Sequence, residues 1–178
     1  RHVVETRKAP RGRRVETIRE VVEGSGQVQE HVGSRTFSFP ATAFWQAHSQ
    51  APAAYTQLVT EWLGQREYQE RTAWDLYGGV GLFVPALAAA VQGKVISVDY
   101  SPAATAAEQP CLADCDVELK SAKVEQVAAQ LPKPGAVVLD PPRTGAGKDV
   151  IRSVAAAAPQ AVVHVGCDPA TFARDLHY

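Results

Sequence analysis

Five short apolar runs between residues 72 and 167 constrain the fold of this chain more than any other feature of its sequence. Ala-rich stretches of helical character separate the runs, and polar residues end them at intervals of about 20–27 residues: Asp75, Asp99, Ser121, Asp140 and Cys167. One strand and one helix fit each interval, and strands buried on both faces are continuously apolar. The pattern predicts an α/β fold with a doubly wound, mostly parallel sheet. Ligands bind beyond the carboxyl ends of such strands, so these residues predict a functional edge.

The segment before this pattern is different in character. The stretches VETIREVV, QVQEHV and RTFSF favour strands, and glycines at 24, 26 and 33 separate them, which predicts a hairpin or small meander. Residues 1–14 lack periodicity and are predicted to be a flexible lead-in. One helical face, with Pro52 in the first turn, is predicted from the spacing of Tyr55, Leu58, Val59, Trp62 and Leu63. We therefore expect residues 1–40 to end a β-rich segment and residues 41–178 to form the α/β domain.

Charge is concentrated at the amino-terminal end. Residues 1–20 contain seven Lys and Arg (among them Arg1 and Arg13) against three Glu, a local charge of +4, so the remaining residues carry −5 of the net charge of −1. A basic arm on an acidic body is compatible with phosphate contacts, and equally with a solvated terminus.

Composition limits the class of protein. With 178 residues, 46% apolar and 21% charged, the chain can form one packed domain with an appendage. The longest apolar stretch, Val80 to Val91, has 12 residues and contains Pro85, which is too short to cross a bilayer. Three cysteines do not make a disulfide framework, which favours the cytoplasm. The chain starts at Arg1 and contains no Met, so we expect a piece of a longer protein.

A glycine-rich turn follows the first predicted strand, in the run Asp75-Leu76-Tyr77-Gly78-Gly79-Val80-Gly81. Glycines allow the backbone to approach a ligand, and the next helix offers free N–H groups. A dinucleotide site would need a third glycine where Val84 stands, which disfavours a nicotinamide dehydrogenase. The carboxylate of Asp75 suits the cationic amino-acid end of S-adenosylmethionine instead. Asp99, at the end of the second strand, is placed to accept hydrogen bonds from ribose hydroxyls.

A candidate nucleophile follows the fifth strand. Asp168 is a good N-cap and Pro169 a good first helical residue, so Cys167 is predicted to lie just ahead of a helix N-terminus, which favours the nucleophilic thiolate. The loop after the fourth strand, Asp140-Pro141-Pro142-Arg143, is stiffened by its prolines. Cys111 and Cys115 lack further Cys or His at ligand spacing, so we expect them to be structural and expect no metal site.

Four segments of the chain resemble those of a known family and follow one another in the same order: FSFPATAFWQAH (Phe37–His48), DLYGGVGLF (Asp75–Phe83), VLDPPRTGAG (Val138–Gly147) and VGCDPATFARDL (Val165–Leu176). Together they resemble the uracil-C5 RNA methyltransferases, which make 5-methyluridine in tRNA and rRNA. The resemblance implies a Rossmann-like class I methyltransferase fold, S-adenosylmethionine as methyl donor and RNA as partner. The stretch Arg13–Val22 is similar to the end of the family's central domain, which precedes the catalytic one.

The resemblance also implies roles for individual residues. Cys167 is similar to the nucleophile that adds to C6 of uracil, Gln46 to a residue at the boundary of cofactor and base, and Asp140 to a carboxylate between donor and base. The positions that match cofactor-binding residues are Asp75, Tyr77, Gly79, Gly81 and Asp99. The implied reaction is methyl transfer to C5 of the adduct, followed by loss of the C5 proton and expulsion of the thiolate.

Departures from the family leave alternatives open. The family's general base is a Glu expected beyond Tyr178, together with two further strands, so we expect a truncated sheet and weak or no activity, since a positioned base contributes about 10²–10⁴ in rate. Ala122-Lys123 stands where the family has an acidic residue, which predicts an altered adenine-side contact. A cytosine-C5 RNA methyltransferase and a non-catalytic module that binds cofactor or RNA remain alternatives. The sequence predicts no membrane association and does not indicate an oligomeric state.

Overall fold

The computed structural model describes residues 3–11, 14–101 and 109–178, and its centre is a five-stranded parallel sheet. The strand order is β7-β6-β5-β8-β9, with every neighbouring pair parallel. The strands are β5 (Thr72–Leu76), β6 (Lys94–Asp99), β7 (Val117–Ser121), β8 (Ala136–Leu139) and β9 (Ala161–His164). The five apolar runs thus form the five strands, as the sequence predicts. The chain winds outward from β5 in both directions, so the sheet is doubly wound.

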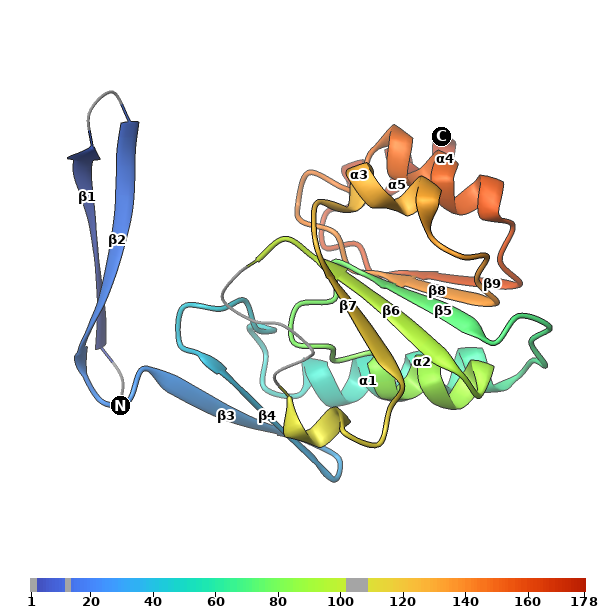
Figure 1. Cartoon of the computed structure of the whole chain (residues 1–178), viewed down its shortest axis with the longest axis horizontal. Coiled ribbons are helices and arrows are strands. Elements are labelled where there is room, and N and C mark those ends of the chain that lie inside the picture. The colour runs from blue at the N-terminus through green and yellow to red at the C-terminus, as the bar shows by residue number, and fades with distance from the viewer. Residues whose placement is uncertain (1–2, 12–13, 102–108) are drawn as a thin grey trace.

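Helices cover both faces of this sheet (Figure 1). One face carries α1 (Ala51–Gly64) and α2 (Val84–Val91), and the other carries α3 (Val124–Val127), α4 (Lys148–Ala157) and α5 (Pro169–His177). Two short 3-10 helices, η2 (Pro110–Leu112) and η3 (Ala128–Gln130), complete the connections. Side chains alternate across the strands, so Ala73 of β5 packs in the core beside α1 and α2, while Trp74 packs in the core beside α3 and α4.

The predicted helix after Pro52 is present as α1, with this proline in its first turn. Only part of its apolar face is covered. Val59 and Leu63 are buried, whereas Leu58 and Trp62 keep 41% and 50% of their surface exposed. None of the described helices is long and apolar enough to cross a membrane.

Two antiparallel hairpins precede the α/β body. The first pairs β1 (Val3–Arg11) with β2 (Arg14–Glu23), and the second pairs β3 (Gln27–Val32) with β4 (Arg35–Pro40). The expectation of a flexible lead-in over residues 1–14 is therefore wrong for residues 3–11, because pairing with β2 satisfies their backbone groups. The β1–β2 hairpin stands apart from the sheet in Figure 1. Arg1 and Arg13 of the basic arm lie outside the described residues.

The second hairpin is fastened to the α/β body by side chains on either side of η2. The amide of Gln109 accepts a hydrogen bond from Ser38 N (2.9 Å) and donates one to Ser38 O (2.6 Å). Arg35 forms two hydrogen bonds with the carboxylate of Asp114, at 2.7 and 2.8 Å. At the end of β4, buried Phe39 stacks on Trp45, with ring centroids 4.8 Å apart. These contacts fix the segment that leads from β4 to Gln46.

Candidate active site

The glycine-rich turn joins the carboxyl end of β5 to α2. Its backbone turns sharply at Tyr77, Gly79 and Gly81, which have φ values of 61°, 54° and 83°. A Cβ on Gly78 would lie 2.3 Å from both Asp75 Oδ2 and Ser97 Oγ, so any other residue at this position would displace one of these two side chains. A Cβ on Gly79 would meet no atom within 4 Å, so this part of the turn is open to a ligand.

Asp75 lies directly beneath this turn and keeps only 1% of its surface exposed. Ser97 Oγ donates a hydrogen bond to its Oδ2 (3.0 Å), while Oδ1 has no hydrogen-bond partner among the described residues. Burial raises the pKa of Asp75 to about 7, against the lowering effect of the Ser97 hydrogen bond. The site therefore contains a buried carboxyl group that changes charge near neutral pH.

Asp99 fixes the turn from the neighbouring strand. Its Oδ2 accepts a hydrogen bond from Gly79 N (2.9 Å), and its Oδ1 accepts one from Ser101 N (2.5 Å). The side chain is only partly buried, so the carboxylate oxygens can accept further hydrogen bonds from a ligand. Asp99 is thus at the carboxyl end of β6, as the sequence predicts, and shapes the turn itself.

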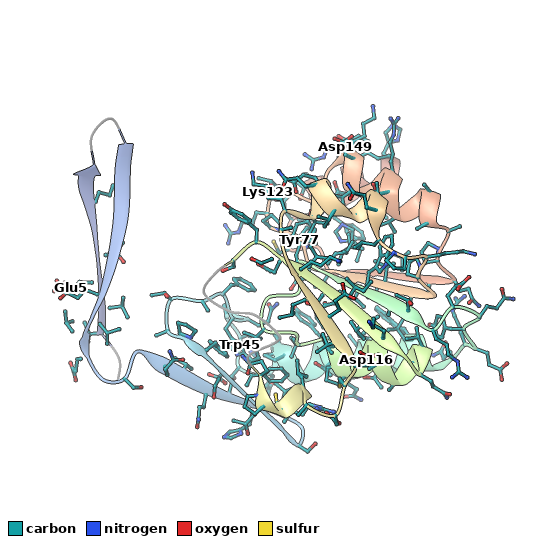
Figure 2. All side chains as sticks on the ribbon, in the orientation of Figure 1. Glu5, Trp45, Tyr77, Asp116, Lys123 and Asp149 are labelled. Carbon is teal, nitrogen blue, oxygen red and sulfur yellow. The ribbon has the colours of Figure 1, made fainter. Side chains whose placement is uncertain are left out.

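Gln46 and Asp140 meet at a small pocket beside the turn. Gln46 Nε2 donates a hydrogen bond to Asp140 Oδ2 (3.1 Å), and burial raises the pKa of Asp140 to about 6, against the lowering effect of that hydrogen bond. The pocket is lined by Phe44, Trp45, Gln46, Tyr77, Gly78, Gly79, Val80, Leu82, Phe83 and Asp140. Figure 2 shows Trp45 near the second hairpin and Tyr77 toward α3, at the carboxyl end of the sheet. The pocket therefore joins segments that are far apart in sequence.

Cys167 lies at the same edge of the sheet, three residues beyond β9 and just ahead of α5. Its thiol is free and exposed. Asp168 caps the helix, since its Oδ1 accepts a hydrogen bond from Thr171 N (2.8 Å), and this bond holds the pKa of Asp168 below its usual range. Cys167 does not line the small pocket, so the structure brings it to the edge without enclosing it.

Known proteins are similar to this chain in sequence and in fold, although no family model matches it. It is 54% identical over 181 residues to an uncharacterized RNA methyltransferase of Corynebacterium glutamicum, a match that covers 99% of this chain and 44% of the relative. It is 33% identical over 139 residues to the 23S rRNA (uracil(747)-C(5))-methyltransferase of Shewanella halifaxensis, covering 75% of this chain and 36% of the relative. The chain belongs to this RNA methyltransferase family. It spans less than half the length of these relatives.

A solved structure supports the fold of this chain. The tRNA (uracil-54, C5)-methyltransferase of Pyrococcus abyssi, in complex with S-adenosyl-L-homocysteine, matches 98% of the chain with a TM-score of 0.73 and 24% identity. The match covers 43% of that protein. The Rossmann-like methyltransferase fold predicted from the sequence is thereby confirmed.

The sequence-predicted site residues of this chain fall into three groups. Gln46, Tyr77, Gly79 and Asp140 surround the pocket, while Asp75, Gly81 and Asp99 shape the turn. Cys167 lies exposed at the same edge of the sheet, outside the pocket lining. No cluster of His, Cys, Asp or Glu in the described residues could hold a metal ion.

Sequence reasoning missed Gly78 and Ser97, which pack against Asp75, and the pocket-lining Phe44 and Trp45. Ser97 had a signal, because it is a polar residue in the middle of an apolar strand. The sequence contained no signal for the close packing at Gly78, because that packing depends on Asp75 and Ser97, which only the fold brings together.

Proposed function

We propose that the chain forms the methyl-donor and base-binding part of an RNA methyltransferase that modifies C5 of a uridine in tRNA or rRNA. Cys167 is the nucleophile at C6 of the uracil in this proposal. Gln46 and Asp140 lie between donor and base, and Asp75, Tyr77, Gly79, Gly81 and Asp99 form the S-adenosylmethionine site. The target base must leave its stack, because C6 is out of reach of a protein thiolate inside a helix. The proposal places the protein in the cytoplasm.

The residues present fit a sulfonium amino acid linked to a nucleoside. The unpartnered Oδ1 of Asp75 is a hydrogen-bond acceptor beneath the turn, suited to the ammonium end of the donor. The open position at Gly79 leaves space for close approach, and the partly exposed carboxylate of Asp99 can accept ribose hydroxyls. When bound, S-adenosylmethionine supplies an electrophilic methyl group.

The chain's own residues account for activation of the base. The Cys167 thiolate forms a bond to C6, and the electrons of the C5–C6 double bond move to C5 and O4 of the uracil, which makes C5 nucleophilic. C5 then accepts the methyl group. A proton-accepting group then removes the C5 proton, which returns an electron pair to the C5–C6 bond and expels the thiolate. The hydrogen bond from Gln46 to Asp140 holds that carboxyl group in place at the rim of the pocket.

One observation supports this proposal most strongly. An exposed thiol, placed ahead of a capped helix, shares the carboxyl edge of the sheet with the Gln46–Asp140 pair and the glycine turn. Thiolate chemistry and methyl donation therefore have their residues on one edge.

Tritium release tests the proposal on the full-length protein. RNA carrying tritium at C5 of its uridines loses the label when C5 is substituted, so incubation with S-adenosylmethionine should release tritium faster than incubation without it. Cys167→Ala should reduce release to background, because the adduct cannot form, whereas the matched variants Cys111→Ala and Cys115→Ala should retain it. Release by Cys167→Ala at the wild-type rate would show that the nucleophile is a different residue.

The two alternatives give different results in the same system. A cytosine-C5 enzyme would yield 5-methylcytidine instead of 5-methyluridine in nucleoside analysis of the product RNA. A non-catalytic module would bind RNA without turnover. Calorimetry with S-adenosylhomocysteine separates this last case, because RNA binding with no cofactor binding would favour the module.

A further inference from the structure

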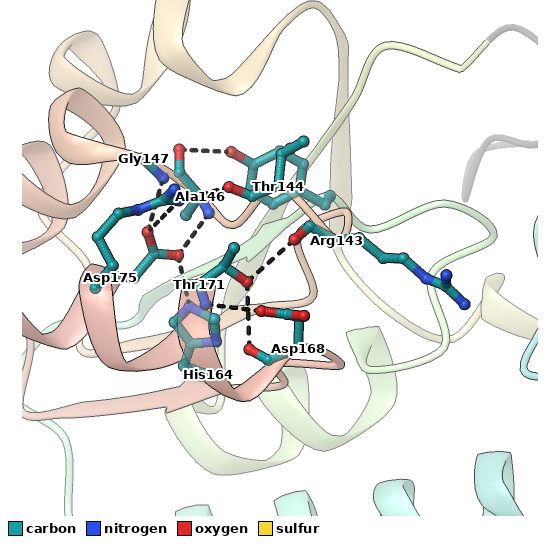
Figure 3. Close-up of polar contacts among 10 residues, drawn as sticks. Arg143, Thr144, Ala146, Gly147, His164, Asp168, Thr171 and Asp175 are labelled. Atoms are coloured by element: carbon teal, nitrogen blue, oxygen red, sulfur yellow. Dashed lines mark hydrogen bonds and ion pairs between the residues drawn. The ribbon is translucent and has the colours of Figure 1, made fainter.

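A buried carboxylate, that of Asp175, lies at the centre of a polar cluster next to the proposed site (Figure 3). Asp175 is in the last turn of α5 and has 0% of its surface exposed. It accepts hydrogen bonds from Ala146 N (2.6 Å) and Gly147 N (3.2 Å). It also pairs with His164 Nε2 (3.2 Å) and Arg174 Nη2 (3.3 Å). Four donors therefore converge on one carboxylate that the reaction above does not use.

These donors keep Asp175 ionised. Burial acts to raise the pKa of this carboxyl, but the hydrogen bonds from Ala146, His164, Gly147 and Arg174 outweigh it and hold the pKa below its usual range. A buried carboxylate with this many partners is costly to disturb, because loss of the charge leaves several buried donors unpaired.

The loop bound by Asp175 is the one that follows Asp140. Gly145 in this loop has a φ of 79°, and a Cβ there would lie 2.7 Å from Asp175 Oδ2. The loop can therefore approach the carboxylate only with glycine at this position. Tyr77 of the glycine turn contacts the same loop, since its hydroxyl donates to Ala146 O (3.4 Å).

A second contact joins the first turn of α5 to the same loop. Thr171 Oγ1 lies 3.0 Å from Arg143 O, three residues beyond Asp140, and 3.2 Å from Asp168 O, and its one hydroxyl proton is shared between these two acceptors. Figure 3 shows Thr171 and Asp175 facing this loop, with the Arg143 side chain extending away from the cluster. Helix α5, which begins two residues after Cys167, is thus docked at both ends on the loop that begins after Asp140.

This docking matters because Asp140 and Cys167 both lie beyond the ends of their strands. The ladder between β8 and β9 ends at the pair of Leu139 and His164, and one further backbone hydrogen bond, from Val165 N to Leu139 O (2.8 Å), follows it. Beyond that hydrogen bond, the separation of the two loops depends on contacts such as those of Thr171 and Asp175. A displacement of about 1 Å at a reacting group can reduce a rate by about 10²-fold.

We infer that Asp175 is a positioning residue, which with Thr171 docks α5 on the loop of residues 143–147 and so sets the position of the Cys167 thiol relative to Asp140 and the glycine turn. This inference rests on the proposed function. It adds that the buried polar cluster around Asp175 maintains the relative positions of Cys167, Asp140 and the glycine turn.

The test compares variants of the full-length protein. Asp175→Asn keeps the shape and removes the charge, Thr171→Val removes the hydroxyl, and Thr171→Ser restores it. Asp149→Asn, an exposed carboxyl on α4, is the matched control. RNA containing 5-fluorouridine traps the adduct, because C5 of this base has no proton to lose after methyl transfer, and the rate of trapping reports the position of the thiol.

Asp175→Asn and Thr171→Val should slow trapping and lower kcat by about 10-fold to 100-fold, with KM for RNA and affinity for S-adenosylhomocysteine within about threefold of wild type. Thr171→Ser and Asp149→Asn should behave like wild type. Unchanged kcat in both Asp175→Asn and Thr171→Val would overturn the inference, as would equal losses in Thr171→Ser and Thr171→Val. If Asp175→Asn fails to fold, the comparison of kcat and trapping rate between Thr171→Val and Thr171→Ser tests the inference by itself.

A readout independent of methylation separates this inference from the proposed function. The alkylation rate of Cys167 by iodoacetamide, located by peptide mass spectrometry, should change by at least about threefold in Thr171→Val and Asp175→Asn and remain unchanged in Thr171→Ser. If wild-type protein traps no RNA, the proposed function fails and the alkylation rates still test the docking. Equal alkylation rates in all variants would contradict it.

Discussion

Asp75, beneath the glycine turn, makes the stability of this chain depend on pH. The pKa of Asp75 is raised to about 7 in the folded protein, chiefly by burial. The folded state therefore keeps a proton through the interval above pH 4 in which the unfolded chain has lost it. Stability conferred by this group is complete below about pH 4 and declines as pH rises toward 7.

Asp75→Asn should remove this decline. The wild-type free energy of unfolding is expected to fall between pH 4.5 and 7 by up to about 1.4 kcal/mol for each pH unit, relative to the variant. Urea unfolding at several pH values measures the difference. Asp149→Asn, which changes an exposed carboxyl, should keep the wild-type slope, and an Asp75→Asn slope equal to wild type would show that Asp75 does not titrate in this range.

Gly78 provides a second residue-scale prediction. Gly78→Ala places a Cβ against Asp75 Oδ2 and Ser97 Oγ, so it should destabilise the fold by about 1–3 kcal/mol and weaken binding of S-adenosylhomocysteine. Ser97→Gly removes one of the two clashing atoms and should recover part of the stability in the double variant. Thermal unfolding and calorimetry measure both effects. Fully additive effects would show that the two positions do not share this contact.

At the scale of elements, the strands of the parallel sheet were predictable and the amino-terminal hairpins were only partly so. The runs TAWDL and KVISVD coincide with β5 and β6, because strands buried on both faces must be apolar throughout. β1 was missed because its existence depends on pairing with β2 and leaves no periodic signal. The helix α1 was predicted from its apolar spacing, but spacing could not show that Leu58 and Trp62 stay half exposed.

The attachment of the second hairpin gives a prediction at this scale. Gln109→Ala removes both hydrogen bonds to the Ser38 backbone and leaves two polar groups unpaired, which should cost about 1–3 kcal/mol. Hydrogen exchange at the Ser38 amide should accelerate, because that amide loses its acceptor. Gln126→Ala, an exposed glutamine on α3, is the control. Unaltered exchange at Ser38 would show that the hairpin is held by its apolar contacts alone.

At the scale of the whole molecule, the site is an assembly of distant segments. The pocket takes residues from the segment after β4, from the glycine turn and from the end of β8. Sequence patterns predicted which strand ends carry polar residues, but the meeting of Gln46 with Asp140 depends on how the second hairpin packs on the sheet. The boundary between residues 40 and 41, proposed from the sequence as a domain limit, stays a prediction.

The basic amino-terminal arm bears on the RNA binding that the proposed function requires. If the β1–β2 hairpin contacts phosphates, Arg7→Gln with Lys8→Gln should weaken binding equally for RNAs of different sequence. The slope of log affinity against log salt should then decrease by about 0.7–0.9 for each phosphate that the arm no longer neutralises. Lys94→Gln is the control. Lys94 is the first residue of β6, at the amino end of the parallel strands, and it pairs with Glu118. Filter binding over a salt series measures the slopes, and equal slopes for wild type and the arm variant would show that the hairpin does not touch the RNA backbone.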